Sequence, residues 1–193
     1  MKTVGEELEP FKVVGIKPGA LDPKNAFEDI YEGSFEGKWK VIVFYPKDFT
    51  FVCPTEIVAY DKLNKSFEER DAILLIGSTD NEFCKVAWKN SHPDLQKTNS
   101  WMFADTLREG YEDPLDPDVV YTGLAHQLGI LDVGSGVALR ATFIVDPDNV
   151  IQHVTVNNLN VGRSADETLR ILDALQTDEL CACNRPIGGD TLS

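Results

Sequence analysis

Two apolar runs on either side of an amphipathic segment constrain the fold of this chain more than any other feature. Residues 39–45 and 72–78 are largely continuous in their apolar character rather than alternating, which is typical of strands buried on both faces of a sheet. The segment between them places apolar side chains at helical spacing, at Ile57, Tyr60, Leu63 and Phe67. Strand, helix, strand predicts a βαβ unit whose two strands are parallel.

The rest of the chain supplies further helices and a hairpin. We expect edge strands or a short turn over 11–16 and 25–31, and helices over 82–91 and 120–128. We also expect a hairpin of 138–145 with 150–156, and a helix opened by the capping box of Ser164 and Glu167. Residues 109–118 predict an acidic, proline-broken loop whose role stays open. This order is typical of an α/β, thioredoxin-like fold, with a central mixed β-sheet flanked by helices. We therefore expect one domain over 1–175 and a C-terminal tail over 176–193.

Composition excludes several classes of partner. The chain has 193 residues and a formal net charge of −14 at neutral pH, so it lacks the basic footprint that binds a phosphate backbone. An anionic membrane surface would repel it as well. We find neither the apolar run of a signal peptide nor a segment of membrane-spanning length. We expect a cytoplasmic protein with no nucleic-acid and no membrane partner.

The four cysteines, at positions 53, 84, 181 and 183, do not form the framework of a secreted disulfide-rich protein. Cys181 and Cys183 could donate two thiolates to zinc, but Cys53 and Cys84 stand alone and no histidine has finger spacing. We therefore expect no metal and no cofactor. Cys84 falls within a predicted helix, where a structural thiol is the better interpretation.

Cys53 has the setting of a nucleophile. It follows the strand over 39–45 after a short loop, and Pro54 suits the first turn of a helix. The thiol therefore lies beyond the carboxyl end of a parallel strand, where active sites of open α/β sheets form. A free thiol, with a pKa of about 8.5, is mostly protonated at neutral pH, and a helix N-terminus stabilises an anion by only about 0.3–2 kcal/mol. A reactive thiolate here needs further hydrogen-bond donors and a cation from elsewhere in the chain.

The residues around Cys53 resemble a known family. They read Pro46-x-x-x-Thr50-x-x-Cys53, which is similar to the peroxidatic loop of the peroxiredoxins, and residues 140–146, 161–168 and 179–183 continue the match in the family's order. The loop and the terminal Cys-x-Cys resemble typical 2-Cys members of the bacterial alkyl hydroperoxide reductase type. The resemblance implies an enzyme, a thiol-dependent peroxidase that reduces hydrogen peroxide and organic hydroperoxides and serves antioxidant defence.

The resemblance also implies roles for single residues. Cys53 would be the peroxidatic cysteine, which the hydroperoxide oxidises to a sulfenic acid. Pro46 would shield the thiolate from water, and the Thr50 hydroxyl and Arg140 would donate hydrogen bonds to the reacting groups. From the residues alone, Arg140 is better interpreted as a surface arginine that snorkels, and the resemblance reverses this.

Glu56 and Arg163 are weaker candidates. By resemblance they belong to a hydrogen-bond network that steadies the loop and Arg140. A structural role explains them equally well, since a carboxylate is favourable in the first turn of any helix.

The tail carries the remaining thiols of interest. By resemblance, Cys181 is the resolving cysteine and Cys183 a secondary resolving one. The disulfide would join Cys53 of one subunit to the tail of another, in a homodimer that assembles into a ring such as a decamer. A thiol reductant protein, which could be thioredoxin, a flavoprotein reductase or a disulfide-shuttling partner, would then reduce it.

Two other functions stay open. The ring-shaped assemblies of the family can become holdase chaperones, and a redox sensor could relay oxidation to partner proteins. The Cys53 loop favours the enzyme, because a chaperone requires neither Thr50 nor Arg140.

Overall fold

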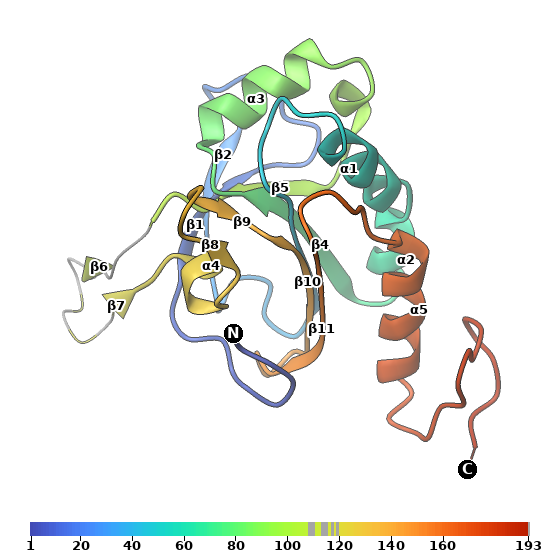
Figure 1. Cartoon of the computed structure of the whole chain (residues 1–193). Coiled ribbons are helices and arrows are strands. Elements are labelled where there is room, and N and C mark those ends of the chain that lie inside the picture. Colours follow the sequence, from blue (N-terminus) through green and yellow to red (C-terminus); the bar gives the residue numbers. More distant parts are fainter. Residues whose placement is uncertain (108–110, 113–115, 117, 119, 193) are drawn as a thin grey trace.

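A mixed sheet of seven strands forms the centre of the molecule (Figure 1). The structure is a computed structural model and describes every residue except 108–110, 113–115, 117, 119 and 193. The strand order is β11-β10-β3-β4-β5-β1-β2, with β3, β4 and β5 parallel and β10 antiparallel to β3. The strands are β1 (Lys12–Ile16), β2 (Phe27–Tyr31), β3 (Trp39–Phe44), β4 (Ala72–Ser78), β5 (Trp101–Ala104), β10 (Arg140–Val145) and β11 (Ile151–Asn157).

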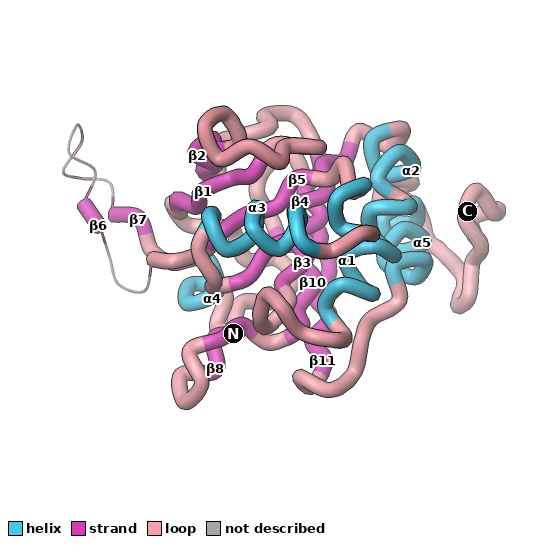
Figure 2. The backbone as a smooth tube through the Cα atoms, turned by 90° about the horizontal axis from the view of Figure 1, so that it is seen from above, coloured by secondary structure: helices cyan, strands magenta, loops and turns pink. Residues whose placement is uncertain are grey.

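Helices cover both faces of this sheet. Figure 1 shows α1, α2 and α5 on one side and α4 on the other, and Figure 2 shows α3 and α1 from above. The bounds are α1 (Cys53–Lys62), α2 (Asn64–Glu68), α3 (Glu82–Ser91), α4 (Leu124–Gln127) and α5 (Ala165–Leu175), with a 3-10 turn over Leu95–Lys97. Two small hairpins pair β6 (Tyr111–Glu112) with β7 (Val120–Tyr121) and β8 (Leu131–Asp132) with β9 (Val137–Ala138).

Two apolar cores follow from the alternation of side chains along β3. Val41 and Val43 pack with residues of α1, α2, α3 and α5, whereas Ile42 and Phe44 pack on the opposite face with residues of α4. Successive residues of a strand point to opposite faces, so a strand buried on both sides must be continuously apolar. This is the physical reason for the apolar run that the sequence shows.

The predicted arrangement is confirmed in its main elements. β3, α1 and β4 form the parallel βαβ unit, β10 and β11 form the antiparallel hairpin, and the Ser164 hydroxyl caps α5 by accepting a hydrogen bond from the backbone N–H of Glu167. The expected central mixed sheet flanked by helices is therefore present. The helix predicted from Cys53 onward is divided into α1 and α2 at Leu63.

The helix predicted over 120–128 is wrong in its first half. Val120 and Tyr121 form β7, and α4 begins only at Leu124. The buried Asp105 carboxylate fixes this start, because it accepts hydrogen bonds from the backbone N–H groups of Leu124 and Ala125 at 2.9 and 2.6 Å. The end was predicted correctly, since Gly129 follows the helix with a φ of 69°.

Two further differences concern β5 and the acidic loop. β5 was not predicted, although it is a run of four apolar residues between β4 and β10 in sequence and pairs with both β4 and β1. Residues 109, 110, 113–115 and 117 of the predicted acidic loop lie outside the described residues. Glu112 lies in β6, so at least this part of the segment is extended.

The division into a domain over 1–175 and a tail over 176–193 stays a prediction. α5 ends at Leu175, and the chain then folds back so that Arg185 pairs with Asp173 of α5 at 2.8 Å. Among the described residues, no helix combines the length and apolar character needed to cross a bilayer.

Gly77 of β4 offers a test of how tightly the sheet is packed. A Cβ at this position would lie 2.4 Å from the ring of Phe103, which itself packs edge-on against Phe44 at 5.0 Å between ring centroids. We expect Gly77→Ala to lower the free energy of unfolding by about 1–3 kcal/mol, because the ring has no free space to enter. Urea denaturation measures the change.

Gly33→Ala is the matched control for Gly77→Ala. Gly33 is exposed and has no atom within 4 Å of the added Cβ, so the change should stay within about 0.5 kcal/mol. Equal losses at the two positions would contradict the packing argument.

Candidate active site

Cys53 is the first residue of α1, and its side chain is buried. The chain leaves the carboxyl end of β3, crosses a loop over 45–52 and enters α1 with Pro54 in the first turn. The predicted position of Cys53 at a helix N-terminus is therefore confirmed. Its Sγ lies 3.4 Å from Nη1 of Arg140, which places the nearest cation of the site directly against the thiol.

Arg140 is held in place by two further contacts. Its Nη1 donates to Oε2 of Glu56 at 2.7 Å, and its Nε donates to the carbonyl oxygen of Leu159 at 2.6 Å. The side chain is only 5% exposed. The interpretation of Arg140 as a surface arginine is therefore wrong, because the carboxylate of Glu56 compensates its charge inside the protein.

Glu56 joins two arginines from distant parts of the chain. Its Oε1 accepts hydrogen bonds from both the backbone N–H and Nε of Arg163 at 2.9 Å, while Oε2 accepts from Arg140. Nη1 of Arg163 also donates to the Ala141 carbonyl and to Oγ1 of Thr142. All three charged side chains are buried. The two weaker candidates of the sequence thus lie in one network with Arg140.

The charges of this network leave a positive excess beside the thiol. Arg140 and Arg163 carry two positive charges and Glu56 one negative charge, so the buried network has a net charge of +1. A thiolate at Cys53 would bring the four side chains to zero.

A cavity of about 310 Å³ opens onto Cys53. The loop supplies one wall, and the other lining residues are Ser135, Val137, Arg140, Leu159 and Asn160. Pro46 and Thr50 are among the residues that line it. The Thr50 hydroxyl differs from the expectation, because it donates its proton to the Lys47 carbonyl at 3.0 Å and is therefore left with acceptor lone pairs for other partners.

The tail thiols lie away from this cavity. The Sγ atom of Cys181 is 3.4 Å from Oγ1 of Thr177 and 3.7 Å from the Ala174 carbonyl, beyond the C-terminal end of α5. Cys183 is exposed. Arg163, beside the opposite end of α5, contacts Glu56 near Cys53, and Figure 1 shows the tail at the far end of α5 from the start of α1. The described chain therefore does not bring Cys53 and the tail thiols together.

Cys84 shows no sign of a reactive thiol. It is partly buried in α3, where desolvation, and next the charge of Asp48, raises the pKa of its thiol to about 11. The thiol is therefore protonated at neutral pH and weakly nucleophilic. This agrees with the structural role that the sequence indicated.

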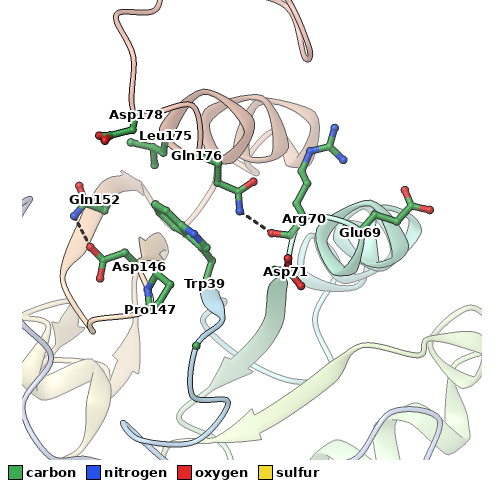
Figure 3. Close-up of a pocket in the computed structure, with 11 residues that line it drawn as sticks. Trp39, Glu69, Arg70, Asp71, Asp146, Pro147, Gln152, Leu175, Gln176 and Asp178 are labelled. Atoms are coloured by element: carbon green, nitrogen blue, oxygen red, sulfur yellow. Dashed lines mark hydrogen bonds between the residues drawn. The ribbon is translucent and has the colours of Figure 1, made fainter.

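A larger cavity than the one at Cys53 lies elsewhere on the described chain. It measures about 680 Å³ and lies at the amino end of β3, beside Trp39 (Figure 3). Nε2 of Gln176 donates there to the Arg70 carbonyl and Nε2 of Gln152 to Oδ2 of Asp146. Its lining contains amides, carboxylates and an arginine but no thiol. The size of a cavity alone would thus not have identified the one that contains the nucleophile.

The sequence alone did not reveal the buried ion pair that joins the loop over 45–52 to α3. Asp48 is a loop residue and Lys85 belongs to α3, yet both are buried and form an ion pair at 3.2 Å. The apolar residues Phe83 and Ala87 of α3 are instead exposed. The helical spacing of Lys85 and Trp88 was the available signal, but a lysine on such a face is normally taken to lie in solvent.

Comparison with known proteins gives a consistent picture. A family model described as the AhpC/TSA family matches residues 4–154. The chain is 44% identical to alkyl hydroperoxide reductase C of Mycolicibacterium smegmatis over 197 aligned residues, which cover 99% of this chain and 93% of the relative. It is 36% identical to peroxiredoxin tpx1 of Schizosaccharomyces pombe, with 98% and 92% covered.

The fold agrees with a solved structure. That structure, named Mycobacterium tuberculosis AhpC, matches with a TM-score of 0.80 at 42% identity, and the match covers 94% of this chain and 97% of the other. The expected thioredoxin-like fold is therefore confirmed.

Removal of Glu56 tests the buried network. Glu56→Ala would leave two buried guanidinium groups without their carboxylate, so we expect the free energy of unfolding to fall by about 3–5 kcal/mol. Thermal or urea unfolding measures it. Glu167→Ala is the control, because its pair with Arg170 lies at the surface and should contribute less than about 1 kcal/mol. A loss at Glu56 as small as that at Glu167 would contradict the network.

Proposed function

The chain belongs to the AhpC/TSA family, and from this premise we propose that it reduces hydroperoxides with the thiol of Cys53. Relatives in the family are named alkyl hydroperoxide reductases and peroxiredoxins, so the chain is a thiol-dependent peroxidase and an oxidoreductase. The observation that carries the proposed site is the contact of 3.4 Å between Sγ of Cys53 and Nη1 of Arg140.

In the first step, the Cys53 thiolate attacks the terminal oxygen of the hydroperoxide. An S–O bond forms as the O–O bond breaks, and the leaving oxygen takes a proton to become water or an alcohol. Sulfur is oxidised to a sulfenic acid and the peroxide is reduced. Arg140 stabilises the negative charge that moves from sulfur to the leaving oxygen, as a fixed donor in a site that has little water.

In this mechanism Thr50 orients the substrate, and Pro46 keeps water away from the thiolate. Because the Thr50 hydroxyl donates to the Lys47 carbonyl, its lone pairs can accept a hydrogen bond from the O–H of the hydroperoxide. This orients the terminal oxygen toward Cys53. Pro46 has no N–H to offer water and is buried in the cavity wall, so it helps to keep water from the thiolate.

The second step requires a thiol from elsewhere. A disulfide needs Cα atoms within about 7 Å of each other, whereas α5, with its 11 residues, is about 16 Å long and lies between the Cys53 loop and the tail of the same chain. We therefore assign the resolving thiol to the tail of a second subunit. The family resemblance makes Cys181 the principal resolver and Cys183 a partial substitute. The Cys181 thiol attacks the sulfenic sulfur, and water leaves as the disulfide forms.

A thiol reductant protein completes the cycle. It donates the two electrons that return the disulfide to thiols. We further propose that the subunits form a homodimer that builds a ring, and that the protein serves antioxidant defence in the cytoplasm. No observation favours a holdase or a redox sensor over the peroxidase.

The assignment of Cys53 and Arg140 is tested by one equivalent of hydrogen peroxide. In a protein with Cys181→Ser and Cys183→Ser, mass spectrometry should find sulfenic acid at Cys53. Arg140→Ala should slow this oxidation by about 10²-fold or more, the scale of losing one fixed donor to a developing charge. Arg170→Ala, which removes a partly exposed arginine, should leave the rate within a few-fold. Oxidation first at Cys84 would overturn the assignment.

The resolving thiols are tested on a non-reducing gel. After peroxide treatment, the wild type and the single variants Cys181→Ser and Cys183→Ser should run as dimers, and the double variant as a monomer. Cys84→Ser should behave as the wild type. A wild type that stays monomeric would exclude the intersubunit disulfide, and failure of Cys183→Ser alone would exchange the two roles.

A further inference from the structure

Helix α3 buries two lysines that the proposed chemistry does not use. The side chains of Lys85 and Lys89 are both fully buried and lie one helical turn apart. Lys89 donates to the Thr98 carbonyl at 3.3 Å. A buried ammonium group is retained only where partners compensate its desolvation. The environments of the two lysines differ in which part of the chain supplies those partners.

Lys85 meets three oxygen atoms from the carboxyl end of the sheet. Its Nζ lies 3.2 Å from Oδ1 of Asp48, 3.1 Å from Oη of Tyr45 and 2.5 Å from Oγ of Ser78. The Tyr45 hydroxyl in turn donates to the same Asp48 oxygen at 2.7 Å. The side chains of Lys85 and Asp48 are 0% and 1% exposed. The cluster is therefore a desolvated ion pair whose hydrogen bonds from Tyr45, Ser78 and Lys85 all reach one carboxylate oxygen, Oδ1 of Asp48.

Asp48 belongs to the loop that lines the Cys53 cavity. It lies between Pro46 and Thr50 in the chain, and its backbone N–H donates to Oδ2 of Asp80 at 2.7 Å. Its side chain is thus held by Lys85 of α3, and its backbone by Asp80, two residues beyond the end of β4. Removing Lys85 would leave the buried Asp48 carboxylate without its ion-pair partner, and Asp48 would then share only the Ser78 hydroxyl with the neighbouring carboxylate of Asp80.

The backbone conformation of Phe49, the residue after Asp48, indicates that the loop needs contacts that hold it in place. Phe49 has a φ of 55°, in the left-handed region that side chains other than glycine rarely adopt. Its ring packs against Trp88 of α3 at 5.8 Å. Strained residues persist where surrounding contacts determine them. α3 supplies a contact to each of two successive loop residues, Asp48 and Phe49.

We infer that Lys85 is a positioning residue for peroxide reduction. Its ion pair with Asp48 holds residues 46–50 against the cavity, so that Pro46 and Thr50 keep their places relative to Cys53. The inference rests on the proposed function of Cys53. Lys85 itself does not touch the reacting atoms. Loss of the ion pair should therefore impair the oriented reaction with a hydroperoxide far more than a reaction that needs only an accessible thiolate.

Two reactions of the same thiol separate these effects. The first is oxidation of Cys53 by hydrogen peroxide, which depends on the oriented cavity, and the second is alkylation by iodoacetamide. Both are followed on the Cys53 peptide by mass spectrometry. In Lys85→Met we expect the peroxide reaction to slow by about 10²-fold, the scale of a displacement of about 1 Å in a catalytic group. Alkylation should change by no more than a few-fold.

Lys89→Met is the matched control. It removes an equally buried lysine from the same helix but touches no residue of the loop, so both reactions should stay within a few-fold of the wild type. Equal ratios of the two rates in Lys85→Met and Lys89→Met would overturn the inference. A wild type whose Cys53 does not react with peroxide would instead overturn the proposed function.

A second variant removes the charge that Lys85→Met leaves behind. In Lys85→Met with Asp48→Asn, no buried carboxylate is left uncompensated, so the peroxide reaction should recover to within about 10-fold of the wild type while remaining slower than it. This variant also serves if Lys85→Met does not fold. A double variant that matches the wild type, or one no faster than a folded Lys85→Met, would overturn the role of the ion pair.

Discussion

The ion pair between Glu56 and Arg140 is the contact on which the site depends. It joins the first turn of α1 to the first residue of β10 and places a guanidinium group against the thiol of Cys53. A helix N-terminus alone stabilises a thiolate only weakly, and an arginine alone would be costly to bury. Glu56 makes the burial of Arg140 possible, because its carboxylate compensates the guanidinium group. The network as a whole still keeps a positive charge beside the thiol, since it also contains Arg163.

The sheet makes this contact possible by burying β3 on both faces. Alternate side chains of the strand belong to separate apolar cores, so the end of β3 is fixed and the loop that follows starts from a defined point. The loop is then held from two directions, by the network of Arg140 at Cys53 and by α3 at Asp48 and Phe49. A rigid sheet and a rigid helix thus position a loop that contains a strained residue.

The separation of the thiols is the reason for the proposed dependence on a second chain. Cys53 lies at the start of α1, whereas Cys181 lies beyond the far end of α5. The helix α5 keeps the two thiols apart within one chain. A single chain of this shape can therefore oxidise Cys53 in the proposed mechanism, but its own tail would have to move before a tail thiol could attack the sulfenic acid. Oligomerisation is therefore part of the proposed chemistry rather than an addition to it.

Much of this could be predicted from the sequence, because it is written in local patterns. Apolar runs indicated the βαβ unit, a proline after Cys53 indicated the helix terminus, and Gly129 and Ser164 marked helix ends correctly. The start of α4 could not be predicted, because it depends on the Asp105 carboxylate from another segment. The burial of Arg140, Lys85 and Lys89 was likewise decided only by tertiary structure. Spacing along a chain records which residues share a face, but not which distant carboxylate or carbonyl compensates a charge once that face is buried.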